Sequence, residues 1–63
     1  MTMEEARKGI GRKVRYIPFV QSGQIEDGVI TSTSYKYVFV KYGNDKISKS
    51  TRAKDLKFID KGR

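Results

Sequence analysis

The side chains of this sequence that could do chemistry are mainly cations and aromatic rings, because histidine and cysteine are both absent. A zinc site built from histidine or cysteine is therefore excluded, as is catalysis by a histidine base or a cysteine nucleophile. The adjacent carboxylates Glu26 and Asp27 would point to opposite faces of a strand. Neither a GxxxxGK nor a GxGxxG phosphate loop is present. We therefore predict no catalytic residue, no metal and no cofactor, and we expect a binding protein instead of an enzyme.

The basic and aromatic residues form a more informative pattern. In a strand, Tyr37, Phe39 and Lys41 share the face opposite to Val38 and Val40. If the two valines fill the core, the two rings face solvent, where they can stack on nucleobases. Arginines and lysines that can bind phosphate flank this face. The predicted nucleic-acid-binding residues are Arg12, Lys13, Arg15, Lys36, Tyr37, Phe39, Lys41 and Arg52.

Other interpretations of these residues remain open. A second basic set consists of Lys46, Lys49, Arg52, Lys54 and Lys57. A phosphate backbone could follow it, or its lysines could protect an exposed sheet edge. Phe39 could be covered by an N-terminal helix through Met3 or Ile10. The aromatic strip could also be buried against another protein or a second copy of the chain.

The distribution of charge favours an anionic partner. The formal net charge is +7. Residues 1–34 hold five basic and four acidic side chains, whereas residues 35–63 hold nine basic and three acidic ones. A one-sided basic field attracts polyanions. We rank nucleic acid first as the partner, with a protein partner or a small homo-oligomer as the alternative.

These side chains must be positioned by short elements. Thr2 and Glu5 have the spacing of a capping box, and Gly9 can end the helix that they begin. Alternating apolar and polar residues predict five strands, over residues 12–18, 25–33, 37–42, 46–49 and 56–59. Turn residues predict a loop over 19–23 and a hairpin turn over 43–45. One helical turn over 51–55 should be capped by Thr51 or Ser50.

Size and patterning predict one small domain. A chain of 63 residues has room for a single core. Gly28, inside the second strand, suggests a bulge, a sharp bend or a close backbone approach. We expect a short helix over residues 1–10, a barrel over 11–60 and a frayed tail over 61–63. The residues expected to face inward are Val14, Tyr16, Ile30, Val38, Val40, Ile47, Leu56 and Phe58.

The order of these elements resembles that of SH3-like barrels, including Tudor-like and KOW-type modules. The resemblance lies in residues 11–16, 26–30, 37–43 and 51–56. The chain is also similar to short proteins encoded by bacteriophages and prophages. The resemblance implies an all-β fold, a five-stranded SH3-like small barrel with a short N-terminal helix and one 3-10 turn before the last strand. This fold hosts many unrelated activities, so it implies no particular ligand.

The sequence also indicates where the protein works. Glu4 and Glu5 stand where the apolar run of a signal peptide would be. No stretch approaches the roughly 20 apolar residues that span a bilayer. The absence of cysteine fits a reducing compartment. We therefore expect a soluble, cytoplasmic protein with no membrane partner.

Overall fold

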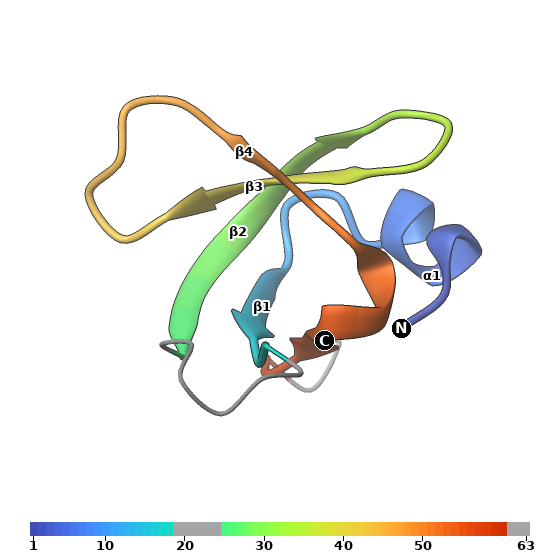
Figure 1. The fold of residues 1–63 in the computed structure, drawn as a ribbon, viewed down its shortest axis with the longest axis horizontal. Coiled ribbons are helices and arrows are strands. Elements are labelled where there is room, and N and C mark those ends of the chain that lie inside the picture. Colours follow the sequence, from blue (N-terminus) through green and yellow to red (C-terminus); the bar gives the residue numbers. More distant parts are fainter. Residues whose placement is uncertain (19–24, 61–63) are drawn as a thin grey trace.

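Five antiparallel strands in one sheet make up most of the fold (Figure 1). The structure is a computed structural model that describes residues 1–18 and 25–60. The elements in chain order are α1 (Met3–Lys8), β1 (Lys13–Tyr16), β2 (Glu26–Thr33), β3 (Val38–Tyr42), β4 (Lys49–Thr51), the 3-10 helix η1 (Ala53–Asp55) and β5 (Leu56–Phe58). The five strands, the short helix and the 3-10 turn predicted from the sequence are therefore confirmed. The loop expected at 19–23 and the tail at 61–63 lie outside the described residues.

The sheet is open, so the closed barrel expected from the sequence is wrong. Its strand order is β4-β3-β2-β1-β5, which leaves β4 and β5 as edges. Both edge strands have only three residues, and each pairs with one neighbour. The 3-10 helix η1 lies between them in the chain and takes the chain from one edge to the other (Figure 1). The sheet is therefore not closed between β4 and β5.

The helix α1 begins with the predicted capping box. The hydroxyl of Thr2 accepts from the Glu5 backbone N–H, and the Glu5 carboxylate accepts from the Thr2 backbone N–H. These bonds satisfy two donors that a helix start otherwise leaves unpaired. At the other end, the N–H of Gly9 donates to the carbonyl of Ala6. No helix in residues 1–18 or 25–60 is long and apolar enough to cross a membrane.

The helix closes one end of the core. Ala6 is fully buried in it, and Met3 packs against it. The Met1 nitrogen donates to the carbonyls of Ala53 and Leu56, which joins the helix end to η1 and β5. A helix this short is marginal in isolation. Its stability therefore depends on these tertiary contacts.

Most of the predicted core is confirmed. The buried apolar residues are Ala6, Val14, Ile30, Val38, Val40, Tyr42, Ala53 and Leu56. Tyr16 and Phe58 are only half-buried and pack against this cluster. Ile47 was expected to face inward, but it is 72% exposed. It lies in the β3–β4 connection, outside any strand, so the sheet provides no surface to cover it.

The fourth strand is shifted from its predicted position. Pairing places Lys49 opposite Val40 and Thr51 opposite Val38, so β4 begins where the predicted strand ends. In this register Thr51 faces inward and its hydroxyl bonds to that of Tyr42 at 2.8 Å. The predicted capping of the helical turn by Thr51 or Ser50 is therefore wrong. The N-cap is Arg52, and its side chain makes no capping bond.

The close approach of β2 and β3 requires a glycine at position 28. A Cβ at this position would lie 2.6 Å from the Lys41 carbonyl oxygen and 2.7 Å from a methyl of Val40. Of the three interpretations of Gly28, close approach is the one that the structure supports. The bulge in this strand lies at Thr31, between the paired residues Ile30 and Ser32.

We expect Gly28→Ala to destabilise the fold, because the added methyl must displace β3 backbone. Overpacking of this kind costs about 1–3 kcal/mol, and each kcal/mol lowers Tm by roughly 4–8 °C in a domain of this size. Thermal unfolding followed by circular dichroism measures the change. Gly43→Asn is the control, since φ is +47° there, an added Cβ meets open space, and asparagine tolerates that conformation. Equal Tm values for Gly28→Ala and the parent chain would contradict the assignment.

Candidate functional site

A basic groove lies beside α1, and the register of β3 with β4 creates it. Because Val38 pairs with Thr51 in an antiparallel ladder, the residues before Val38 lie next to those after Thr51. The β2–β3 turn therefore meets the start of η1, and Met3 of α1 completes the wall. We call this the helix-side groove. It has a volume of about 370 Å³ and is lined by Met3, Lys36, Tyr37, Arg52, Ala53 and Lys54.

The charges of the helix-side groove are all positive and unpaired. Lys36, Arg52 and Lys54 are exposed, and none of the ion pairs in the described part of the chain involves them. No carboxylate lines the groove. The ring of Tyr37 lies among these cations and is 36% exposed. This arrangement can bind an anion and stack on a flat ring at the same place.

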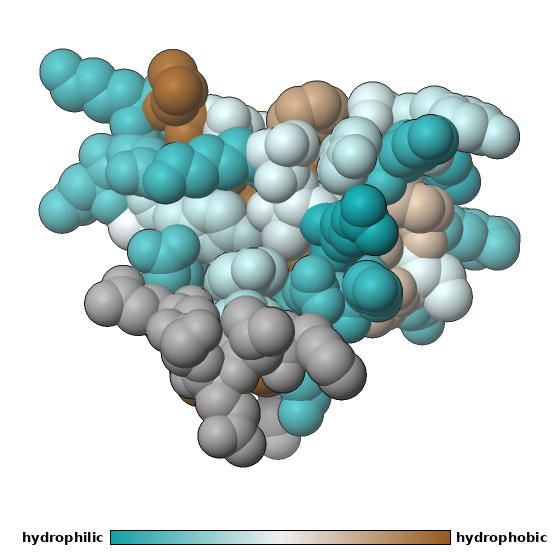
Figure 2. All heavy atoms as spheres, in the orientation of Figure 1, coloured by the Kyte–Doolittle hydropathy of each residue, from teal (hydrophilic) through white to brown (hydrophobic). Residues whose placement is uncertain are grey.

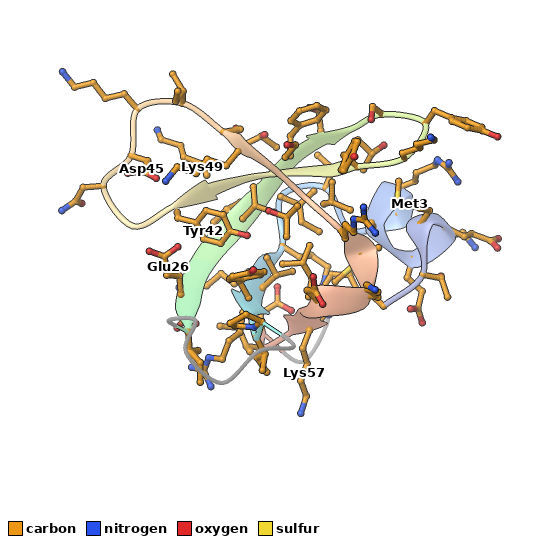
Figure 3. The ribbon with its side chains drawn as sticks, viewed as in Figure 1. Met3, Glu26, Tyr42, Asp45, Lys49 and Lys57 are labelled. Atoms are coloured by element: carbon orange, nitrogen blue, oxygen red, sulfur yellow. The ribbon has the colours of Figure 1, made fainter. Side chains whose placement is uncertain are left out.

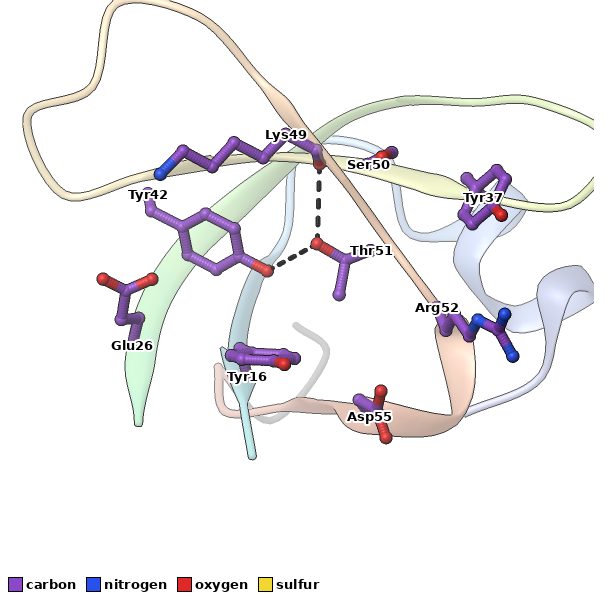
Figure 4. A pocket seen from close by; sticks show the side chains of 9 residues that line it. All are labelled: Tyr16, Glu26, Tyr37, Tyr42, Lys49, Ser50, Thr51, Arg52 and Asp55. Carbon is purple, nitrogen blue, oxygen red and sulfur yellow. Dashed lines mark hydrogen bonds between the residues drawn. The ribbon is translucent and has the colours of Figure 1, made fainter. Parts of the chain in front are cut away.

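A second cavity lies on the inner side of the sheet and is lined by residues of β1, β2, β3, β4 and η1. We call it the mouth pocket (Figure 4). It has a volume of about 430 Å³ and is lined by Tyr16, Glu26, Tyr37, Tyr42, Lys49, Ser50, Thr51, Arg52 and Asp55. Lys49, Tyr42 and Glu26 lie at one end of the sheet, and Met3 lies at the other (Figure 3). The two cavities share Tyr37 and Arg52 in their walls.

The mouth pocket has a rigid aromatic wall. Tyr42 is 5% exposed, and its hydroxyl is hydrogen-bonded to Thr51. Its ring meets that of Tyr16 edge to face, with ring centroids 6.2 Å apart. Burial raises the pKa of Tyr42 above its ordinary value, and the nearby charges of Glu26 and Asp55 raise it further, while the bond to Thr51 opposes the shift. The phenol therefore stays neutral and fixed near neutral pH.

Both signs of charge line the mouth pocket. The two cations come from one chain segment, Lys49 from β4 and Arg52 just after it, and they lie at opposite ends of the pocket in Figure 4. Lys49 is 3.6 Å from Asp45, so part of its charge is already balanced. The two carboxylates come from different elements, since Glu26 starts β2 and Asp55 ends η1, and they also lie at opposite ends of the pocket. Neither of these two carboxylates takes part in an ion pair within residues 1–18 and 25–60.

The outer face of the sheet carries four of the predicted residues. Lys13 and Lys41 are exposed on either side of Val29, in one row across β1, β2 and β3. Arg15 pairs with Asp27 through two hydrogen bonds of 2.8 and 3.2 Å. The bond from Arg15 also lowers the pKa of Asp27 below its ordinary value. The local charge of Arg15 is therefore balanced.

Phe39 and Arg12 are also held in place by the fold. Phe39 is half-buried on the outer face between Ser32 and Ser50. The Arg12 guanidinium lies 3.8 Å from the centroid of the Phe58 ring and bonds to one Asp60 oxygen at 2.9 and 3.0 Å. A cation over a ring that also bonds to a carboxylate fastens the end of β5 to β1.

The structure therefore divides the predicted binding residues. Lys36, Tyr37 and Arg52 meet in the helix-side groove, whereas Lys13, Arg15, Phe39 and Lys41 lie on the outer face. Lys54, from the second basic set, joins the groove group. The sequence interpretation did not single out the mouth pocket. A signal was present, because Glu26 shares its strand face with Gly28 and Ile30 at period two, so a carboxylate begins an inward row.

We expect Tyr42→Phe to lower stability and to change its pH dependence. At neutral pH the variant loses one buried hydrogen bond, worth about 0.5–1.5 kcal/mol. The raised pKa of Tyr42 means that stability is complete below the unfolded pKa of about 10 and falls as pH rises through the folded value. Urea unfolding at neutral and alkaline pH tests both effects. The exposed Tyr35→Phe is the control. A parallel alkaline loss in Tyr42→Phe and the parent chain would contradict this assignment.

These side chains can bind charged and flat groups. In residues 1–18 and 25–60, no group of three or more histidine, cysteine, aspartate or glutamate side chains could hold a metal ion. Comparison with known proteins found no family model, curated protein or solved structure that matches the chain.

Proposed function

We propose that this protein is a non-catalytic module that binds nucleic acid through the helix-side groove. The observation that carries the proposal is the meeting of three unpaired cations around an exposed tyrosine, with no carboxylate in the groove wall. Phosphate oxygens would bind Lys36, Arg52 and Lys54, and a base would stack on Tyr37. Arg52 would contribute most to orientation, since its planar guanidinium can bind a phosphate through two parallel bonds.

The contrast with Arg12 and Arg15 supports this assignment. Arg12 and Arg15 are both bonded to carboxylates, so their charges are balanced within the fold. The cations of the groove have no such partner among the described residues. A net charge of +7 would assist solubility wherever the cations stood. Their concentration in one groove beside a ring is a more specific arrangement.

The order of the elements resembles that of SH3-like modules, and this resemblance selects neither the function nor the ligand. The alternative is a protein-interaction module or a small homo-oligomer that uses an exposed aromatic strip. It has less support, because Tyr37 lines the groove while Phe39 lies half-buried between two serines. On the face shown in Figure 2, hydrophilic atoms predominate and the hydrophobic side chains are scattered. A protein interface usually has a continuous, less charged centre.

We expect short single-stranded oligonucleotides to bind at physiological salt, and we expect the double variant Lys36→Ala/Lys54→Ala to weaken binding. Fluorescence anisotropy over a series of salt concentrations measures this. For single strands, each lost phosphate contact reduces the slope of log K against log salt by about 0.7. The double variant should therefore have a slope smaller by about 1.4. It leaves Tyr37 and Arg52, which both cavities use, in place.

The control is the single variant Lys46→Ala, an exposed lysine outside both cavities. It should weaken binding less than either Lys36→Ala or Lys54→Ala alone. Equal losses for all three lysines would mean generic polycation behaviour and would overturn the proposal. Binding that disappears at physiological salt would do the same. In that case, size-exclusion chromatography at two concentrations would test for the homo-oligomer.

A further inference from the structure

The mouth pocket is lined by both cations and carboxylates, so neither a simple anion nor a simple cation matches all of its charges. An anion that enters it meets the two unpaired carboxylates of Glu26 and Asp55. A cation meets Lys49 and Arg52. A ligand that carries both an anionic group and hydrogen-bond donors can satisfy both signs of charge. A nucleotide has this character, with a phosphate and, in three of the common bases, an exocyclic amino group.

We propose that the mouth pocket holds one unpaired base of a bound single strand and selects bases that present amino donors, guanine most strongly. This inference rests on the proposed function and adds the form and base preference of the ligand. The geometry that supports it is that the two cavities share Tyr37 and Arg52 in their walls. A strand whose phosphates occupied the helix-side groove would pass these two side chains to reach the mouth pocket.

The aromatic wall of the pocket suits a flat ring. Tyr16 is half-buried and lies between Glu26 and Asp55 in the close view of Figure 4. Tyr42 holds the edge of this wall, because its own ring is buried and its hydroxyl is bonded to Thr51. A base stacked on Tyr16 therefore has a carboxylate within the same pocket on each side. The volume of about 430 Å³ falls in the range of small-molecule sites, which is about 300–1,000 Å³.

The carboxylates determine the base preference. An ionised carboxylate only accepts hydrogen bonds. Guanine presents two neighbouring donors on its pairing edge, its ring N–H and its amino group, whereas thymine presents one N–H between two acceptor oxygens. Two parallel bonds to one carboxylate are stronger and more selective than one. The base must also leave a duplex to enter the pocket, so single strands are preferred over double strands.

The test compares labelled oligothymidine with the same strand carrying one central guanine, by anisotropy at physiological salt. We expect the guanine strand to bind about 5- to 150-fold more tightly, the range of one two-bond base contact. In Glu26→Gln/Asp55→Asn this preference should disappear, while oligothymidine binding is kept or improved by the loss of two negative charges. Glu4→Gln is the control, since Glu4 is exposed on α1 and lies outside both cavities.

A second measurement uses the unchanged chain, so that it does not depend on a variant folding. Guanosine monophosphate should shift the backbone amide signals of Glu26, Thr51 and Asp55 in NMR spectra at lower concentration than thymidine monophosphate does. Equal affinity for both strands, with salt-dependent binding retained, would overturn the base pocket and leave the proposed function standing. Failure of every oligonucleotide to bind would overturn both. Binding of a peptide in the mouth pocket, with no oligonucleotide binding, would also overturn both.

Discussion

The pairing of β3 with β4, fixed on its inner side by the buried bond between Tyr42 and Thr51, is the constraint on which the rest of the structure depends. A buried hydroxyl that lost its partner would cost free energy, so the bond favours one register. This register places Thr51 opposite Val38 and so brings the two chain segments of the helix-side groove together. It also places Lys49, Ser50 and Thr51 of β4 in the wall of the mouth pocket.

Local patterns could be predicted from the sequence because their causes are local. The capping box of α1 depends on residues three apart, and the alternation in β3 depends only on strand geometry. The position of β4 could not be predicted in this way, since the 46–49 segment alternates as a strand would. The choice of 49–51 depends on the contact of Thr51 with Tyr42, in a different strand. The openness of the sheet depends likewise on contacts between distant elements.

The candidate site shows the same division. Its basic character and the exposure of Tyr37 could be predicted from composition and alternation. The sequence could not show which cations are available to bind a ligand. Arg12 and Arg15 are balanced by carboxylates that lie 48 and 12 residues away in the chain. Pairs of this kind depend on the register of β1 with its two neighbours. The position of an arginine in a sequence pattern therefore does not determine whether its charge is free to bind a ligand or is paired within the fold.

The position of β5 beside β1 has a consequence for the order of folding. The β2–β3–β4 meander joins segments that are neighbours in the chain, so its contacts form after short loop closures. The β1–β5 ladder, with the Arg12–Asp60 pair at its end, joins residues up to 48 positions apart. Closing such a span costs more entropy before any contact stabilises it. We therefore expect the meander to form first and the docking of β5 onto β1 to complete the native state.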